Sequence, residues 1–169
     1  MARARAIVGE VPVIAVNGAA RDVKAFAIYS QHAERFTQRG FDWIRHQKRL
    51  FGPDFTVHSA RWRDGCPWVQ YWWPEATGPG SSAWDARKVA WLMGFETVIL
   101  CGCPLVPGPY VDYRLGGLMH RADVVDSYLL AIAADVDWHP GVYSMSGRTG
   151  ELFGEPKWTE MSCDGSKPM

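Results

Sequence analysis

The hydrophobic positions along this chain form short continuous apolar runs that alternate with longer segments of helical character. Runs of roughly four to eight apolar residues, bounded by Gly, Pro, Asn or Ser, are typical of buried strands. The predicted strands are residues 11–16, 25–29, 55–59, 97–101 and 141–144. The run over 97–101 is continuous and rich in β-branched residues, which favours a parallel sheet that is buried on both faces.

Helices are predicted between these runs. The main helical segments are residues 33–50, 82–93 and 122–134. Gly40 interrupts the first of them, and an apolar stripe runs along the last. For the second, Ser82 suits the N-cap position and Gly94 suits the residue just beyond the C-terminus. One further helical turn is predicted over 149–153.

Strands that alternate with helices predict a parallel α/β sheet with helices on both faces. We therefore expect one Rossmann-like α/β domain over residues 1–156, followed by a polar C-terminal tail over 157–169. Residues 61–80 and 104–109 are rich in Pro, Gly and aromatic side chains, so we expect irregular structure there. The chain of 169 residues is long enough for one domain with its own core.

The charge balance limits the kinds of partner to expect. Lys plus Arg number 18 and Asp plus Glu number 18, so the net charge is zero, which argues against broad electrostatic binding to nucleic acid. A basic cluster does occupy one segment, and such a run is usually a solvated helix face. Its members are Arg35, Arg39, Arg45, Lys48 and Arg49. No apolar run approaches the roughly 20 residues that span a bilayer, so we expect a cytoplasmic protein without a membrane partner.

Cysteine and tryptophan usage adds two expectations. Four cysteines do not make a disulfide framework at this length in the cytosol, and only one residue separates Cys101 from Cys103, so no metal site is predicted. Four of the nine tryptophans fall in one segment. They are Trp62, Trp68, Trp72 and Trp73. Three interpretations stay open for them: they line a ligand cleft, they fill the core, or they cover a subunit interface. We expect a homo-oligomer that buries some of these rings.

The turns that follow the predicted strands carry residues suited to hold a ligand. In open α/β sheets, ligands bind beyond the carboxyl ends of the strands, and a helix N-terminus attracts phosphate or carboxylate. These turns therefore predict a site for a small nucleotide ligand, although Asn17 and Gly18 would equally suit a tight turn without one. The candidate residues are Asn17, Gly18, Gly80, Ser81, Ser82, Gly102 and Ser144. The chain has no Walker A and no GxSxG sequence, and the absence of GxGxxG argues against a dinucleotide enzyme.

His120 is the leading candidate for a general base. It stands between a Pro- and Gly-rich loop and the helix predicted over 122–134, so we expect it at the carboxyl edge of the sheet, where an imidazole can accept a proton near neutral pH. Tyr110 and Tyr113 lie in the same loop, and their uncharged hydroxyls suit a departing phosphate. The alternatives stay open: His120 caps its helix or lies exposed, and the tyrosines anchor the loop.

The order of these motifs resembles that of two related enzyme families. The block Ser-Ser-Ala-Trp-Asp-Ala-Arg-Lys-Val-Ala-Trp-Leu-Met-Gly-Phe-Glu-Thr-Val-Ile-Leu-Cys-Gly over 81–102 resembles one shared by Rossmann-like bacterial sialyltransferases and MptE-like 6-hydroxymethylpterin diphosphokinases. Residues 144–156 resemble an ending, Ser-Met-Ser-Gly-x-Thr-x-Glu-Leu-x-Gly-x-Pro, that recurs in uncharacterised phage and prophage proteins of this fold. A phage origin would place the protein in the host cytoplasm.

The sialyltransferase resemblance implies a CMP-type nucleotide sugar as substrate and displacement at a sugar carbon without a metal ion. His120 would then deprotonate the acceptor, while Tyr110 and Tyr113 would help the phosphate to leave. The residues that hold the nucleotide would be Asn17, Ser81 and Ser82. The diphosphokinase resemblance implies instead a pyrophosphokinase that uses ATP and Mg²⁺. A third alternative is a non-catalytic phage-derived module that binds a nucleotide or a protein.

Overall fold

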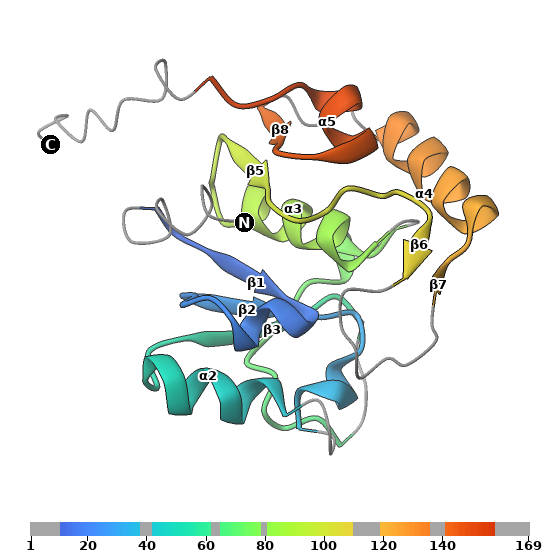
Figure 1. Ribbon diagram of the computed structural model, residues 1–169. Helices are drawn as coiled ribbons and strands as arrows, with labels where there is room; N and C mark the ends of the chain where they lie inside the picture. The colour runs from blue at the N-terminus through green and yellow to red at the C-terminus, as the bar shows by residue number, and fades with distance from the viewer. Residues whose placement is uncertain are drawn as a thin grey trace, which may run out of the picture.

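The computed structural model describes residues 11–37, 42–61, 65–78, 81–109, 119–135 and 141–157. Its largest sheet is parallel and has four strands in the order β1-β2-β3-β4 (Figure 1). These strands are β1 (Ile14–Val16), β2 (Ala27–Tyr29), β3 (Thr56–Ser59) and β4 (Tyr71–Trp72). A second parallel sheet pairs β5 (Val98–Leu100) with β8 (Val142–Ser144), and β6 (Gly108–Pro109) pairs antiparallel with β7 (Met119–His120).

Helices and short 3-10 turns connect the strands. The 3-10 turns are η1 (Asn17–Arg21), η2 (Ala33–Phe36) and η3 (Pro74–Ala76). The α-helices are α2 (Trp43–Phe51), α3 (Ser82–Leu92), α4 (Ala122–Asp135) and α5 (Gly147–Phe153). Helix α3 ends as the sequence predicts, because Gly94 adopts a φ of 93° just beyond the C-cap Met93, a conformation that glycine takes without strain.

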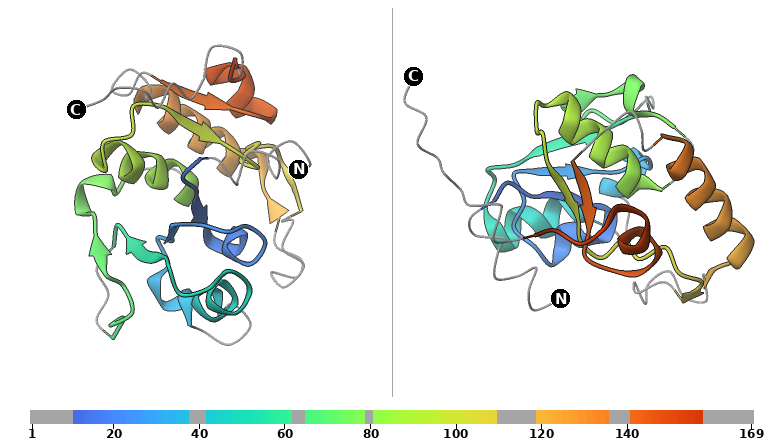
Figure 2. Two further views of the ribbon diagram at one scale, coloured as in Figure 1. Left: turned by 90° about the vertical axis from the view of Figure 1, so that its left-hand side faces the viewer. Right: turned by 90° about the horizontal axis from the view of Figure 1, so that it is seen from above.

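The two faces of the four-stranded sheet pack against different helices (Figures 1 and 2). Side chains alternate across a strand, so Ala15 belongs to one apolar cluster, whereas Ile14 and Val16 pack against another. The first cluster joins the sheet to the segments of η1, η2 and α2 through Ala20, Phe36 and Trp43. The second joins the sheet to α3 through Ala86 and Val89. A third cluster packs α4 against the β5-β8 sheet.

Parallel register brings the strand ends together at one edge. Val16 pairs with Tyr29, Tyr29 with His58, and Ser59 with Trp72, so the last residues of these four strands lie side by side. We call this side the carboxyl edge. Thr77 donates a hydrogen bond from Oγ1 to the carbonyl of Ala60, at 3.0 Å, and thereby ties the chain that leads into α3 to this same edge.

The structure confirms the predicted α/β class, with parallel strands and helices on both faces of the larger sheet. It differs from the expected single sheet, because the described strands form three separate hydrogen-bonded sets. Residues 1–10 and 158–169, which include most of the predicted tail, lie outside the described residues. No helix in the described part of the chain is long and apolar enough to cross a membrane.

Two local predictions are wrong. The stretch 61–80, expected to be irregular, contains η3 and β4, because the backbone N–H groups of Gln70 and Trp73 donate to carbonyls of β3. The N-cap of α3 is Ser81 and not Ser82. Ser81 has extended dihedrals, and its Oγ accepts a hydrogen bond from the N–H of Trp84 at 3.4 Å, so Ser82 is the first helical residue.

Candidate functional site

Polar side chains at the carboxyl edge form a network that connects three strands to α3. Ser30, which follows β2, donates from Oγ to Oδ1 of Asn17 at 2.7 Å, immediately after β1. Ser59, the last residue of β3, donates from Oγ to the carbonyl of Ser30 at 2.8 Å. Asn17 itself has a φ of 52°, a left-handed conformation that asparagine tolerates better than most residues. These bonds fix the first residues after three adjacent strands.

Asp85 of α3 occupies the centre of this network. Its carboxylate is fully buried, and Oδ2 accepts hydrogen bonds from the Tyr29 hydroxyl at 3.2 Å and the Gln31 amide at 2.5 Å. Oδ1 has no hydrogen-bond partner among the described residues. Burial raises the pKa of Asp85 to about 6, although the bonds from Gln31 and Tyr29 and the positive charges of Lys88 and Arg61 act in the opposite direction. Asp85 is therefore an acid that titrates near neutral pH inside the core.

Tyr29 and Arg61 complete the charge distribution around this acid. Burial, and then the nearby Asp85 carboxylate, raise the pKa of Tyr29 above its ordinary range, so its hydroxyl remains a hydrogen-bond donor. Arg61 is exposed, and its positive charge favours the ionised forms of both Tyr29 and Asp85. The carboxyl edge thus presents the exposed cation of Arg61 beside a buried acid.

Several predicted ligand residues lie in the turns at this edge. Asn17 and Gly18 open η1, and the carbonyl of Gly18 accepts a hydrogen bond from Arg21 Nε at 3.3 Å. Ser81 and Ser82 start α3 and are half-buried. Gly80 lies outside the described residues. Asn17, Gly18, Ser81 and Ser82 therefore lie in the turns next to the Asp85 network.

Gly102 and Ser144 belong to the second sheet. Gly102 follows β5, is exposed and has a φ of 73°. Ser144 is fully buried, and its Oγ lies 2.8 Å from the Thr149 hydroxyl and donates to the carbonyl of Leu100 at 3.4 Å. Because its hydroxyl is bonded inside the protein, Ser144 holds β8 against β5 and α5.

The predicted catalytic residues are placed only in part. His120 lies in β7, where its backbone pairs with Gly108, and α4 begins two residues later. The expected place of His120 at the carboxyl edge and its role as a base stay predictions. Tyr110 and Tyr113 lie outside the described residues.

The tryptophans that motivated the expected oligomer pack against the core of the chain itself. Trp68 and Trp72 lie against the cluster that joins the sheet to α2, and Trp68 Nε1 donates to the carbonyl of Ala33 at 3.0 Å. Trp73 packs on the α3 side, and its Nε1 donates to His58 Nδ1 at 2.9 Å. Trp62 lies outside the described residues. The three rings that can be placed are half-buried by contacts within the chain, and the expected homo-oligomer stays a prediction.

His58 is a second buried titratable group, but its environment is a structural one. The ring nitrogens are both engaged, Nδ1 with Trp73 and Nε2 with the Thr56 hydroxyl at 2.6 Å, and the ring stacks on Tyr71 with a centroid distance of 4.9 Å. Burial lowers the pKa of His58 to about 4. The imidazole is therefore neutral at physiological pH and packs as an aromatic ring with two hydrogen bonds.

Sequence reasoning missed Asp85, Tyr29 and Gln31. Asp85 stands in the first turn of a helix, where an acidic residue is ordinary, and Tyr29 ends an apolar run. The available signal was the spacing of two residues between Tyr29 and Gln31 at the end of β2, which places both side chains on the same face of the sheet. Only the packing of α3 on that face identifies their partner.

The described residues contain no group of three His, Cys, Asp or Glu side chains arranged to hold a metal ion. In comparisons with known proteins, no family model, no curated protein and no solved structure matches this chain.

Proposed function

We propose that this chain binds a nucleotide or nucleotide sugar at the carboxyl edge of its four-stranded sheet. The observation that carries the proposal is the hydrogen-bonded network from Asn17 through Ser30 and Gln31 to the buried Asp85. It lies beyond the carboxyl ends of parallel strands, which is the general location of ligands in open α/β sheets. Asn17, Ser82 and the exposed Arg61 supply amide, hydroxyl and cationic contacts at the same edge.

Asp85 serves as a positioning residue in this proposal. An ionised carboxylate with one unpartnered oxygen is costly in the core, and an asparagine of the same shape would accept the same two hydrogen bonds without a charge. Such costly groups are concentrated at functional sites, where they fix the geometry of the residues that touch the ligand. Here the carboxylate fixes Gln31, next to Ser30 and its bond to Asn17.

We further propose that the two parallel sheets together make one Rossmann-like unit. The supporting observation is that α3 packs against both β1 and β5. The order β4-β3-β2-β1 followed by β5-β8 would then place the reversal of strand order between β1 and β5. In doubly wound folds this reversal is where the ligand crevice opens.

The reaction that we propose rests on the sequence pattern: metal-independent glycosyl transfer from a CMP-type donor, with His120 as the base that deprotonates the acceptor. Replacement of the base should remove roughly a hundredfold or more of the turnover while the donor still binds. Transfer assays and calorimetry on His120→Ala test this role, and unchanged transfer would contradict it.

Binding itself is tested by thermal shift with CMP, UDP, GDP and ATP, each with and without Mg²⁺. A ligand present at about 100 times its Kd stabilises the folded state by about 2.7 kcal/mol, which raises the melting temperature of a chain of this size by roughly 5–10 °C. Magnesium-dependent binding of ATP alone would favour pyrophosphoryl transfer over glycosyl transfer. No shift with any of the four at millimolar concentration would contradict the proposal.

The site is tested with Asn17→Gly, because glycine keeps the left-handed backbone and removes only the side-chain amide. We expect this variant to lose most of the ligand-induced shift. The matched control is Ser127→Ala, which deletes an exposed hydroxyl on α4 that donates to the carbonyl of Val124, at 2.8 Å. A shift that survives in Asn17→Gly would place the nucleotide elsewhere.

A further inference from the structure

Helices α3 and α4 meet at a cluster in which one carboxylate oxygen serves three donors. Asp135 Oδ2 lies 2.8 Å from Trp84 Nε1, 3.2 Å from Arg87 Nη2 and 2.8 Å from Lys88 Nζ. We call these four residues the α3–α4 cluster. Within the cluster two cations share one carboxylate, and the charge of the buried Asp85 also acts on both Arg87 and Lys88.

Arg87 is only partly satisfied in this cluster. Its side chain is fully buried, and its guanidinium lies over the Trp84 ring, 3.8 Å from the ring centroid. Nη2 reaches Asp135, but Nε and Nη1 have no hydrogen-bond partner among the described residues. Buried donors of a charged group cost several kcal/mol when they are left unpaired. A ligand anion that accepts hydrogen bonds from Nε and Nη1 would remove this cost.

Lys88 leads from the cluster to the start of α3. A Cβ added to Gly78 would lie 2.8 Å from Lys88 Nζ, so the ammonium group lies close to the backbone of Gly78. Gly78 lies in the segment that leads into Ser81, the N-cap of this helix of 11 residues. The first N–H groups of a helix lack partners within it and attract anions. The Lys88 ammonium, which is paired with Asp135, thus lies near the chain that leads into α3, and Arg87 brings its unpaired donors to the ring of Trp84 in the first turn.

We propose that the α3–α4 cluster is a phosphoryl-binding subsite, in which Arg87 and Lys88 hold the phosphate of a bound ligand against the first turn of α3. The inference rests on the proposed function, since it assigns the phosphate end of the nucleotide, while the Asn17 network holds the remainder. Arginine suits this role because its planar fork bonds two phosphate oxygens, and lysine adds a compact charge. Asp135 keeps both cations in place.

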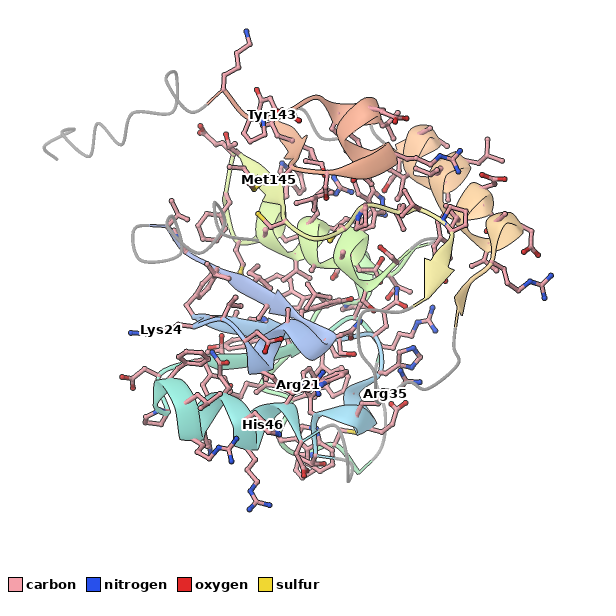
Figure 3. The ribbon with its side chains drawn as sticks, in the orientation of Figure 1. Arg21, Lys24, Arg35, His46, Tyr143 and Met145 are labelled. Carbon is pink, nitrogen blue, oxygen red and sulfur yellow. The ribbon has the colours of Figure 1, made fainter. Side chains whose placement is uncertain are left out.

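A competing cationic region lies on the other side of the four-stranded sheet. Phe36, Ile44, Arg45, Lys48 and Arg49 line an open hollow of about 500 Å³ beside α2. Figure 3 places Arg21, Arg35 and His46 around this helix as well. Arg45, Lys48 and Arg49 line an open hollow at the surface together with the acidic Asp42, whereas Arg87 is buried. The hollow provides the rival location for an anion, and Lys48→Gln is the matched control for Lys88→Gln.

The experiment measures binding of inorganic pyrophosphate by calorimetry at low ionic strength. Loss of one charge-assisted hydrogen bond weakens binding by about tenfold or more. We expect that loss in Lys88→Gln, partial rescue in Lys88→Arg, and a change of less than about twofold in Lys48→Gln. Arg87→Lys, which keeps the charge but removes the fork, should weaken binding as well. Circular dichroism is used to check that each variant is folded. If Arg87→Lys does not fold, the result for Lys88→Gln alone decides the test.

The outcomes separate this inference from the proposed function. Pyrophosphate binding that depends on Lys88, without binding of any nucleotide, supports the subsite and contradicts the nucleotide proposal. Nucleotide binding that is lost in Asn17→Gly but unchanged in Lys88→Gln overturns the subsite and leaves the nucleotide proposal standing. Binding lost in Lys48→Gln instead, or no binding of pyrophosphate at millimolar concentration, also overturns the subsite.

Discussion

Replacement of Asp85 by asparagine should stabilise the protein at neutral pH. The pKa of Asp85 is about 6 in the folded protein, against 3.8 as the ordinary value, so the folded state binds more protons than the unfolded state between these two pH values. Stability must therefore fall as the pH rises through this window. With about 1.36 kcal/mol for each pH unit, ionised Asp85 lowers the free energy of unfolding by about 3 kcal/mol at pH 7.5.

Asparagine removes this cost because it is neutral at every pH and its oxygen can still accept from Tyr29 and Gln31. We expect urea denaturation to show Asp85→Asn more stable by about 3 kcal/mol at pH 7.5, and by less than about 1 kcal/mol at pH 4, where the acid is largely protonated in the folded state. The exposed Asp54→Asn is the control and should change stability by less than about 0.5 kcal/mol. A difference between Asp85→Asn and the natural protein that does not depend on pH would refute the reasoning.

Two further predictions concern other buried positions. The pKa of His58 is about 4, below the ordinary 6.5, so the unfolded state binds more protons between these two values and the free energy of unfolding rises with pH. In the natural protein this rise between pH 4 and pH 7 includes about 3 kcal/mol from His58. Urea denaturation at the two pH values should show that His58→Gln lacks this contribution. Gly147 and Gly154 both have positive φ, but a Cβ would overlap Pro104 only at Gly147. Gly154→Ala should lower the free energy of unfolding by about 1 kcal/mol, and Gly147→Ala should lower it by about 1–3 kcal/mol more. Equal melting temperatures of the two variants would contradict the overlap at Gly147.

The strands were predictable where the local pattern alone decides the structure. Residues 55–59, 97–101 and 141–144 become β3, β5 and β8 with ends shifted by one residue at most, because apolar and β-branched runs bounded by turn residues have few alternatives. Strand β4 has only two residues in an aromatic-rich stretch. Its identity depends on backbone bonds to β3, which no local pattern encodes.

The start of α3 shows how tertiary contacts override a local motif. Ser82 and Asp85 have the spacing of a capping box, in which the acid would reach back to the N-cap backbone. The structure uses Ser81 as the N-cap instead and turns the Asp85 carboxylate inward to Tyr29 and Gln31. The acid that holds the candidate site together was therefore hidden in an ordinary helix start.

Which candidate residues lie together at the site could be predicted only in part, because tertiary contacts decide it. Asn17 and Ser81 could be placed in turns at the carboxyl edge from strand direction alone, because parallel strands end on one side. The internal bonding of Ser144 could not be foreseen, since its hydroxyl contacts Thr149 of α5 and the carbonyl of Leu100 in β5, which lies 44 residues away in the sequence.

The parallel pairing also sets an order in which the molecule can assemble. Ile14 pairs with Ala27 and His58 with Tyr71, but Val98 pairs with Val142, so the second sheet closes a much longer loop. Because the entropic cost of closing a loop grows with the logarithm of its length, pairing Val98 with Val142 costs about 1 kcal/mol more than either of the two shorter pairings. During synthesis, the strands up to Trp72 can pair before the segment with Val142 has been made. Until α3 follows, the face with Ile14, Val16 and Tyr29 stays open to solvent, so the growing chain is most prone to aggregate in that interval.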